Sequence, residues 1–463
     1  MDFMGSKTYD FLADSFLFRD DLIEDQFANT PNAEIQQELR RYREFCIGHR
    51  DEIVAEVDSS ASTLALYSPE PIRILDAKQA SLYIDQYVLQ DPLLPFTEGP
   101  SKMSAVLATA GHFSRGQGQE VRLDDLSRTL RTMKALTPMV AANFVKFVPT
   151  SLAFEEPAEV PIYASDNYFE DALPAEILRV FKEAAKVQTL ILLDDGSIRL
   201  EKLRPCRAIS ITFKGDLNAR GYMYMLHQIE ETKQQPDSNE NVIIRLSYPH
   251  SPPDAGYFTA WVQQSVNQAA RSLFEQIYDS AAFASKLNLA YSTRSDLRFR
   301  ALRKAFKPNT SIPINTANVF MNFHLPFIED IGLERLMHIR QQEGEAFCNF
   351  RFAVESKITS LQSTSDATDA KKRAQEAVRE ITEVQVHDVQ LKIKSIREKL
   401  GLAVITASAV NLVAAVQNQG VGLLSAAVAS VWPVASTYLD YRRDIKRHPA
   451  FFLWKVLPKH RRR

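Results

Sequence analysis

The chain has 463 residues, of which 45% are hydrophobic and 24% are charged, and it contains 15 glycines and 22 prolines. This composition excludes collagen-like, extensively disordered and disulfide-scaffold proteins, and the length predicts two or three domains. The net charge of −2 is unevenly distributed. Residues 1–439 carry 46 basic and 55 acidic side chains, a net of −9, and residues 440–463 carry nine and two, a net of +7. An acidic body with a basic tail predicts an anionic partner for the tail.

Residues 1–165 are predicted to form a helix-rich N-terminal region. Residues 33–45 have apolar side chains at helical spacing, and residues 123–136 form a second predicted helix that ends or kinks near Pro138. Two short extended segments are expected in this region, at 81–90 and at 144–149, and each ends at a proline-containing turn.

Residues 166–325 are predicted to be a mixed α/β region. Strands are expected at 188–193 and 197–200 on either side of Asp194-Asp195-Gly196, a good hairpin turn signal. Further strands are expected at 208–213, 242–247 and 319–325. A long and mostly helical segment is predicted from 255 to 306, because few helix breakers occur there.

Residues 326–400 are predicted to form a helical stalk. Its second helix has a narrow apolar seam that suits helix pairing over about two heptads, formed by Val386, Val389, Ile393, Ile396 and Leu400. Residues 401–439 follow as a predicted hydrophobic helical hairpin, with apolar arms at 401–416 and 421–439 around a polar turn. The overall prediction is an α+β fold in which helices predominate.

The hairpin lies within the most unusual segment of the chain, because residues 400–439 contain no Asp, Glu, Lys or Arg. At about 1.5 Å per residue the two arms reach roughly 24 and 28 Å, close to the approximately 30 Å hydrocarbon core of a bilayer. The segment therefore predicts membrane insertion or association. Two alternatives remain open, namely burial in a soluble helical bundle and burial in an oligomer.

The basic tail, residues 440–463, supports a membrane surface as the partner, since aromatic rings beside cations suit the headgroup region. Nucleic acid is a less favoured partner, because the tail lacks an aromatic strand pattern. A protein partner is expected along the helices of 332–400. The predicted contacts with a membrane or anionic surface are Trp432, Arg442, Arg443, Lys446, Arg447, Phe451, Phe452, Trp454, Lys455, Arg461, Arg462 and Arg463.

Catalytic chemistry has only one set of candidates in the sequence. Asp194 and Asp195 end a predicted strand, where nuclease carboxylates often lie, and Glu201 follows nearby. Turn formation explains Asp-Asp-Gly more simply. No phosphate-binding loop, zinc motif or serine-hydrolase motif is present, so we expect neither a cofactor nor a metal.

Three features favour residence in the cytosol, with the inner face of the cell membrane as a further site. The N-terminus lacks the basic start and apolar stretch of a secretory signal. Cys46, Cys206 and Cys348 are far apart, which is typical of reduced, buried thiols. Lys/Arg residues flank the uncharged segment on both sides, as expected when both ends of a hairpin stay in the cytosol.

Three segments resemble parts of uncharacterised bacterial proteins. The first runs from Leu325-Pro326 through Arg340, Glu343 and Phe347 to Phe350-Arg351, the second comprises 136–139 with 147–149, and the third is Pro449-Ala450-Phe451-Phe452-Leu453-Trp454. The resemblance carries no known activity. It implies a bacterial protein and, through variable gene neighbourhoods, a role in defence or conflict.

Together these observations predict a non-enzymatic bacterial protein with a membrane-associating C-terminal hairpin, serving as a defence or conflict effector. One alternative is a soluble protein-interaction scaffold whose hairpin is buried in a helical bundle. The other is an enzyme of unrecognised type, such as a nuclease that uses the mixed α/β region.

Overall fold

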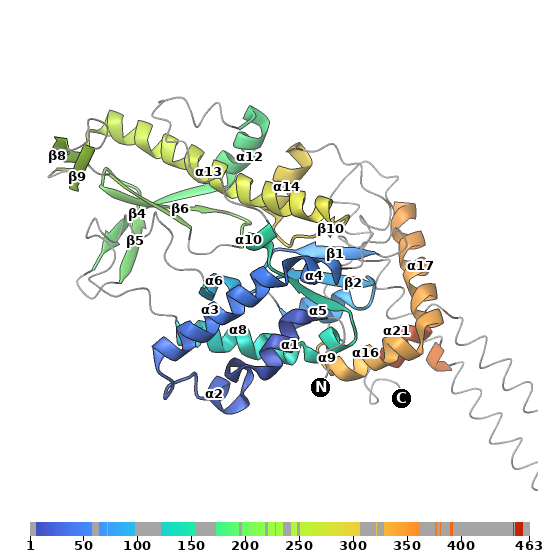
Figure 1. The fold of residues 1–463 in the computed structure, drawn as a ribbon. Coiled ribbons are helices and arrows are strands. Elements are labelled where there is room, and N and C mark those ends of the chain that lie inside the picture. Colours follow the sequence, from blue (N-terminus) through green and yellow to red (C-terminus); the bar gives the residue numbers. More distant parts are fainter. Residues whose placement is uncertain are drawn as a thin grey trace, which may run out of the picture.

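The computed structural model describes residues 6–57, 64–71, 73–97, 122–153, 173–193, 197–217, 221–226, 228–234, 242–247, 251–305, 321, 328–361, 376, 380, 389–391, 448 and 450–456. The fold is α+β with helices predominating, as predicted. The described strands form a parallel sheet, an antiparallel sheet and a separate two-stranded ribbon (Figure 1).

Helices from the N-terminal region surround the parallel sheet. They are α1 (Lys7–Asp14), the 3-10 turn η1 (Phe16–Phe18), α2 (Asp20–Glu24), α3 (Asn32–Gly48), α4 (Arg50–Ala55), α5 (Ile74–Ala80), α6 (Leu94–Thr97), α8 (Leu123–Ala135), α9 (Thr137–Ala141) and α10 (Thr150–Ala153). The four strands are β1 (Ala65–Ser68), β2 (Gln86–Gln90), β3 (Val145–Val148) and β10 (Ala290–Tyr291), in the order β10-β1-β2-β3.

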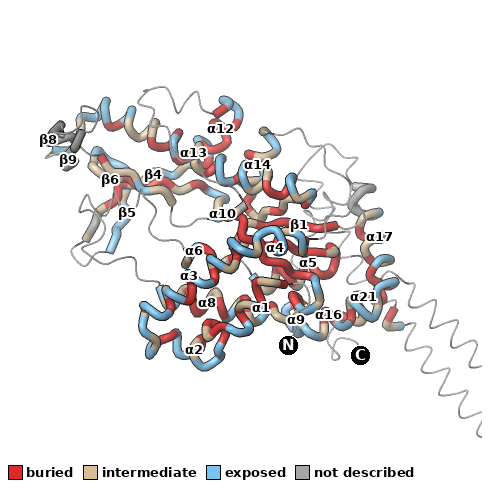
Figure 2. The backbone as a smooth tube through the Cα atoms, viewed as in Figure 1, coloured by how far each residue is buried: buried red, intermediate tan, exposed pale blue. Residues whose placement is uncertain are grey.

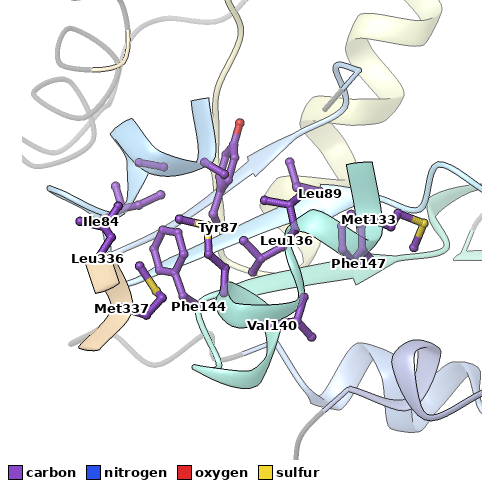
Figure 3. Close-up of a cluster of buried hydrophobic side chains, with 14 of the residues drawn as sticks. Ile84, Tyr87, Leu89, Met133, Leu136, Val140, Phe144, Phe147, Leu336 and Met337 are labelled. Atoms are coloured by element: carbon purple, nitrogen blue, oxygen red, sulfur yellow. The ribbon is translucent and has the colours of Figure 1, made fainter. Parts of the chain in front are cut away.

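Both faces of the parallel sheet are covered, so every residue of β1 and β3 is buried (Figure 2). On one face, Leu66, Leu89 and Phe147 join the main core with residues of α1, α3, α8 and α9. Figure 3 shows part of this core, where Met133 and Leu136 approach strand residues Tyr87 and Phe147. On the other face, Tyr67 and Val88 pack against Phe283 and Ala284.

Three differences from the sequence predictions concern this sheet. Only residues 86–90 of the segment 81–90 are extended, because residues 81–83 form a turn after α5. Strand β1 was not predicted, and its four residues are too few to show a period. The predicted helical segment 255–306 is interrupted, because Asn288 adopts a φ of 53° and the chain then enters β10.

The antiparallel sheet lies in the mixed α/β region. Helix α12 (Ala175–Ala184) leads directly into β4 (Ala185–Leu192), which lies between β5 (Ile198–Lys202) and β6 (Ala208–Phe213), with β7 (Tyr222–Met225) beyond β6. The predicted strands 188–193, 197–200 and 208–213 correspond to β4, β5 and β6. The ribbon pairs β8 (Gln228–Gln234) with β9 (Val242–Ser247), the latter at its predicted position.

A glycine is required where the chain enters β7. Gly221 has a φ of +67°, and a Cβ placed there would lie 2.5 Å from the carbonyl oxygen of Ile211. Any other residue would have to displace β6, so this position admits only glycine.

One long helix joins the two sheets. Helix α13 (Ala255–Lys286) has 32 residues and crosses the molecule from the ribbon to β10 (Figure 1). Leu273 and Ile277 pack with α12 and β6, whereas Phe283 packs on the parallel sheet. Helix α13 therefore contributes to the hydrophobic cluster on the antiparallel sheet and to the cluster on one face of the parallel sheet.

The loop between β10 and α14 (Asp296–Ala305) supplies a second, polar connection, which we call the 293–298 joint. Glu70, after β1, is buried and accepts hydrogen bonds from the Thr293 hydroxyl, from the Arg294 amide at 2.8 Å and from Arg294 Nε at 2.8 Å. On its other side, Arg298 Nε lies 3.0 Å from Asp216 Oδ1, beside the antiparallel sheet. The joint thus fixes one sheet relative to the other by charge-assisted hydrogen bonds.

The C-terminal helices lie beside the parallel sheet. They are α16 (Leu333–Gln342), α17 (Gly344–Leu361) and the short α21 (Phe451–Val456). The predicted hairpin at 401–439 lies outside the described residues. So does the predicted strand at 319–325, apart from Met321, which is helical where a strand was predicted.

We expect Glu70→Gln to lower the free energy of unfolding by about 1–3 kcal/mol, because the substitution removes a charged acceptor from buried donors. Chemical denaturation monitored by circular dichroism measures this change. The control is Glu275→Gln, which alters a carboxylate in the exposed Arg271–Glu275 pair of α13 and should change stability by less than about 0.5 kcal/mol. Equal effects of the two substitutions would contradict a structural role for the joint.

Candidate functional site

The C-terminal segment returns to the body as helix α21, which packs against α16 and α17. The ring of Phe452 lies 5.3 Å from that of Phe347 and 5.9 Å from that of Phe350, measured between centroids. Lys455 Nζ lies 3.5 Å from Glu343 Oε1. We call α16, α17 and α21 together the C-terminal platform.

A buried arginine attaches the platform to the parallel sheet. The guanidinium of Arg340 lies 4.2 Å from the ring centroid of Phe347 and 4.8 Å from that of Phe144, a double cation–π arrangement. It donates hydrogen bonds to the backbone carbonyls of Ser81 and, at 3.2 Å, Asp85. Burial lowers the pKa of Arg340 to about 10, so the group is still a cation at neutral pH.

A second arginine acts on the same loop before β2. Arg351 Nη1 lies 2.7 Å from Asp85 Oδ2, and that carboxylate also accepts a 2.8 Å hydrogen bond from the Leu64 amide. The Tyr83 hydroxyl donates to Glu355 of α17 at 2.8 Å. Because Asp85 holds both the entry to β1 and the platform, the two arginines connect the C-terminal helices to the centre of the sheet.

The segments quoted for the bacterial resemblance meet at this place. Leu136 and Met139, Phe347 and Phe350, and Phe451 and Phe452 all belong to the main core. Figure 3 shows the neighbouring part, where Leu336 and Met337 of α16 approach Phe144 and Ile84. The site consists of aromatic rings, paired cations and backbone acceptors, so it can hold a chain segment firmly.

Most predicted surface-contact residues lie outside the described residues, and the described ones are buried or half-buried. Those outside are Trp432, Arg442, Arg443, Lys446, Arg447, Arg461, Arg462 and Arg463. The side chains of Phe451, Phe452 and Trp454 are only 5, 0 and 9% exposed, because they complete the core instead of facing an outer surface. Lys455 is half-buried between Glu343 and the ring of Phe451.

The predicted catalytic candidates are not gathered into a site by the described structure. Asp194 and Asp195 lie outside the described residues. Glu201 is on β5 with Oε1 2.9 Å from Arg199 Nε and Oε2 3.2 Å from Arg204 Nη2. Both partners are exposed arginines, an arrangement that is typical of a solvated strand.

In the described part of the chain, no three His, Cys, Asp or Glu side chains are grouped so that they could bind a metal. A hollow of about 190 Å³ lined by Ile47, Gly48, Arg50, Asp51 and Leu152 is smaller than usual ligand pockets. Of the three cysteines predicted to be buried, Cys46 is buried, Cys206 is partly exposed and Cys348 is exposed.

Within the described part of the chain, no helix combines the length and the apolar character needed to cross a membrane. Comparison with known proteins gave no match to a family model, to a curated protein or to a solved structure.

Sequence reasoning missed the acceptors that make the platform. Asp85 lies in the segment 81–90 that the sequence predicts to be extended. Its ion pair with Arg351 joins residues 266 positions apart, so no local sequence pattern predicts this contact. Glu70 was missed for the same reason, because its partners Thr293 and Arg294 lie more than 220 positions away. A usable signal was the recurrence of Arg and Phe at helical spacing between 340 and 351.

We expect Phe452→Ala to destabilise the protein by about 3–5 kcal/mol and to release α21, because the ring is fully buried against two others. Hydrogen exchange measured by mass spectrometry should show loss of protection at 451–456. The control is Phe352→Ala on α17, whose ring is 73% exposed and whose loss should change stability by less than about 0.5 kcal/mol. If α21 kept its protection without the Phe452 ring, the ring cluster would not be what holds it.

Proposed function

We propose that the protein is a membrane-associating protein whose folded body holds both ends of an uncharged segment, residues 400–439. The proposal is supported most by the burial of residues on both sides of that segment. Val389 precedes it, Ala450 and Phe452 follow it, and all three are buried in the same core cluster.

This arrangement matters because it constrains how the segment can meet a bilayer. A segment attached to one body at both ends must enter and leave a membrane on the same side, as a hairpin does. Lys392, Lys394, Arg397 and Lys399 precede the segment, and Arg442, Arg443, Lys446 and Arg447 follow it. Cations at both ends favour a hairpin whose ends stay on the cytosolic side.

The soluble scaffold is the second candidate, and the burial of α21 favours it. Its aromatic residues resemble a membrane-interface motif in sequence but pack in the core. The apolar arms of 401–439 would then be buried similarly, against helices of the body or of a partner protein. A role as a defence or conflict effector rests on the sequence resemblance alone.

The deciding measurement is flotation of full-length protein with liposomes that contain anionic lipid. Truncation before residue 400 is unsuitable, because it also removes Phe452 and Trp454 from the core. We expect Val428→Asp in the full-length chain to lower the membrane partition coefficient about 100-fold, since a carboxylate near a helix centre costs roughly 2.5–3.5 kcal/mol on insertion.

The matched control is Gln419→Asp, which places the same charge in the polar turn and should leave flotation nearly unchanged. Circular dichroism must show that both variants are folded. Protein that never floats, with Val428→Asp causing unfolding or aggregation, would contradict the membrane proposal and support the buried hairpin. Binding that high salt abolishes would show attraction of the basic tail without insertion.

A further inference from the structure

Strand β5 forms one edge of the antiparallel sheet, and no described residue pairs with its outer side. It exposes two large apolar side chains, Ile198 at 39% and Leu200 at 43%. Natural edge strands usually avoid such exposure, because unpaired backbone groups beside apolar side chains attract another strand. The edge therefore has the character of a binding surface for a strand.

The hydrogen-bond pattern of the β4–β5 pair shows which backbone groups are free at this edge. The Leu193 amide donates to the Ser197 carbonyl at 2.8 Å, which makes 193 and 197 a hydrogen-bonded pair. Such pairs alternate along an antiparallel ladder, so Arg199 and Glu201, opposite Ile191 and Thr189, direct their backbone groups toward β4. The amides and carbonyls of Ile198, Leu200 and Lys202 consequently point outward.

These outward groups suit one partner very well, namely the same strand of a second copy. If two β5 strands pair antiparallel about a two-fold axis at Leu200, Leu200 opposes its own copy, and Ile198 opposes Lys202. The Leu200–Leu200 and Ile198–Lys202 pairs are then hydrogen-bonded pairs, because the backbone amides and carbonyls of these residues point outward from β5. Arg199 then faces Glu201 of the other copy, twice, at the non-hydrogen-bonded positions, where side chains approach most closely.

Side chains on the sheet face agree with this register. Leu190 and Leu200 oppose each other within one copy, so they lie on the same face as Ile198, and Met223 of β7 lies farther along that face. Pairing at Leu200 would join two such apolar faces into one. On the opposite face, Arg199 and Glu201 pair with each other at 2.9 Å within the strand, and in the dimer each would exchange this contact for the same contact with the second copy.

We propose that the protein forms a symmetric homodimer by antiparallel pairing of β5 with β5 of a second copy, in the register that places Leu200 on the two-fold axis. The paired sheets then form one continuous eight-stranded sheet. The pairing uses the one open edge of each β5, so it closes at two copies and does not propagate through this strand.

Charge substitutions test the register in the full-length protein by sedimentation equilibrium. Arg199→Glu and Glu201→Arg should each raise the dimer dissociation constant at least tenfold, because each places like charges opposite each other twice. The double variant carrying both substitutions should regain the original dissociation constant, because the opposite charges face each other again. The control Glu275→Arg on α13 should change nothing.

A symmetric cross-link gives a second readout that does not depend on charge. In a Cys348→Ser background, Leu200→Cys should form an intermolecular disulfide, because hydrogen-bonded pairs have Cα atoms about 5.5 Å apart. Ile198→Cys should not, since its copy lies several residues away. The proposal would be overturned if the wild-type protein stayed monomeric across the whole concentration range of the sedimentation experiment. It would also be overturned if the double variant failed to regain the dimer.

Discussion

The fold depends on a core that needs both ends of the chain. Tyr9 of α1 and Phe452 of α21 belong to one hydrophobic cluster, which also contains Leu66, Leu89 and Phe147 from one face of the parallel sheet. Each fully buried aromatic side chain contributes roughly 1.5–3 kcal/mol through apolar burial. Val389 and α21, which precede and follow residues 392–447 in the chain, are therefore both attached to the same core.

Attachment of the C-terminal helices uses directional contacts as well as burial. Arg340 and Arg351 both bind the loop that ends at Asp85, and Asp85 also receives the backbone that enters β1. A buried cation without partners would cost several kcal/mol, so the platform is stable only in the position where ring faces and carbonyl oxygens meet Arg340. The apolar contacts stabilise the attachment of the platform to the sheet, and the two arginines determine where on the sheet the platform lies.

Local patterns predicted the parts of this molecule that are governed by neighbours in sequence. The hairpin of β4 and β5, strands β6 and β9, and helix α8 appear close to where the periodicity and turn residues placed them. In the parallel sheet, β2 and β3 lie within the predicted extended segments 81–90 and 144–149, whereas β1 and β10 were missed, since they have only four and two residues. The platform was missed because its contacts join residues far apart in the sequence. The segment Phe451-Phe452-Leu453-Trp454, followed by Lys455, has the composition of a membrane interface. Its packing against the distant Phe347 and Phe350 shows that it is part of the core.

The proposed dimer and the proposed membrane association use different parts of the molecule. Strand β5 lies at one end of the molecule and α21 at the other, on opposite sides of the parallel sheet (Figure 1). Pairing at β5 would leave the C-terminal platform of each copy uncovered. A dimer would then carry two uncharged segments, and the second would meet a bilayer at the high effective concentration set by the first. If each segment inserts as proposed, two of them would hold the protein at a membrane far more firmly than one.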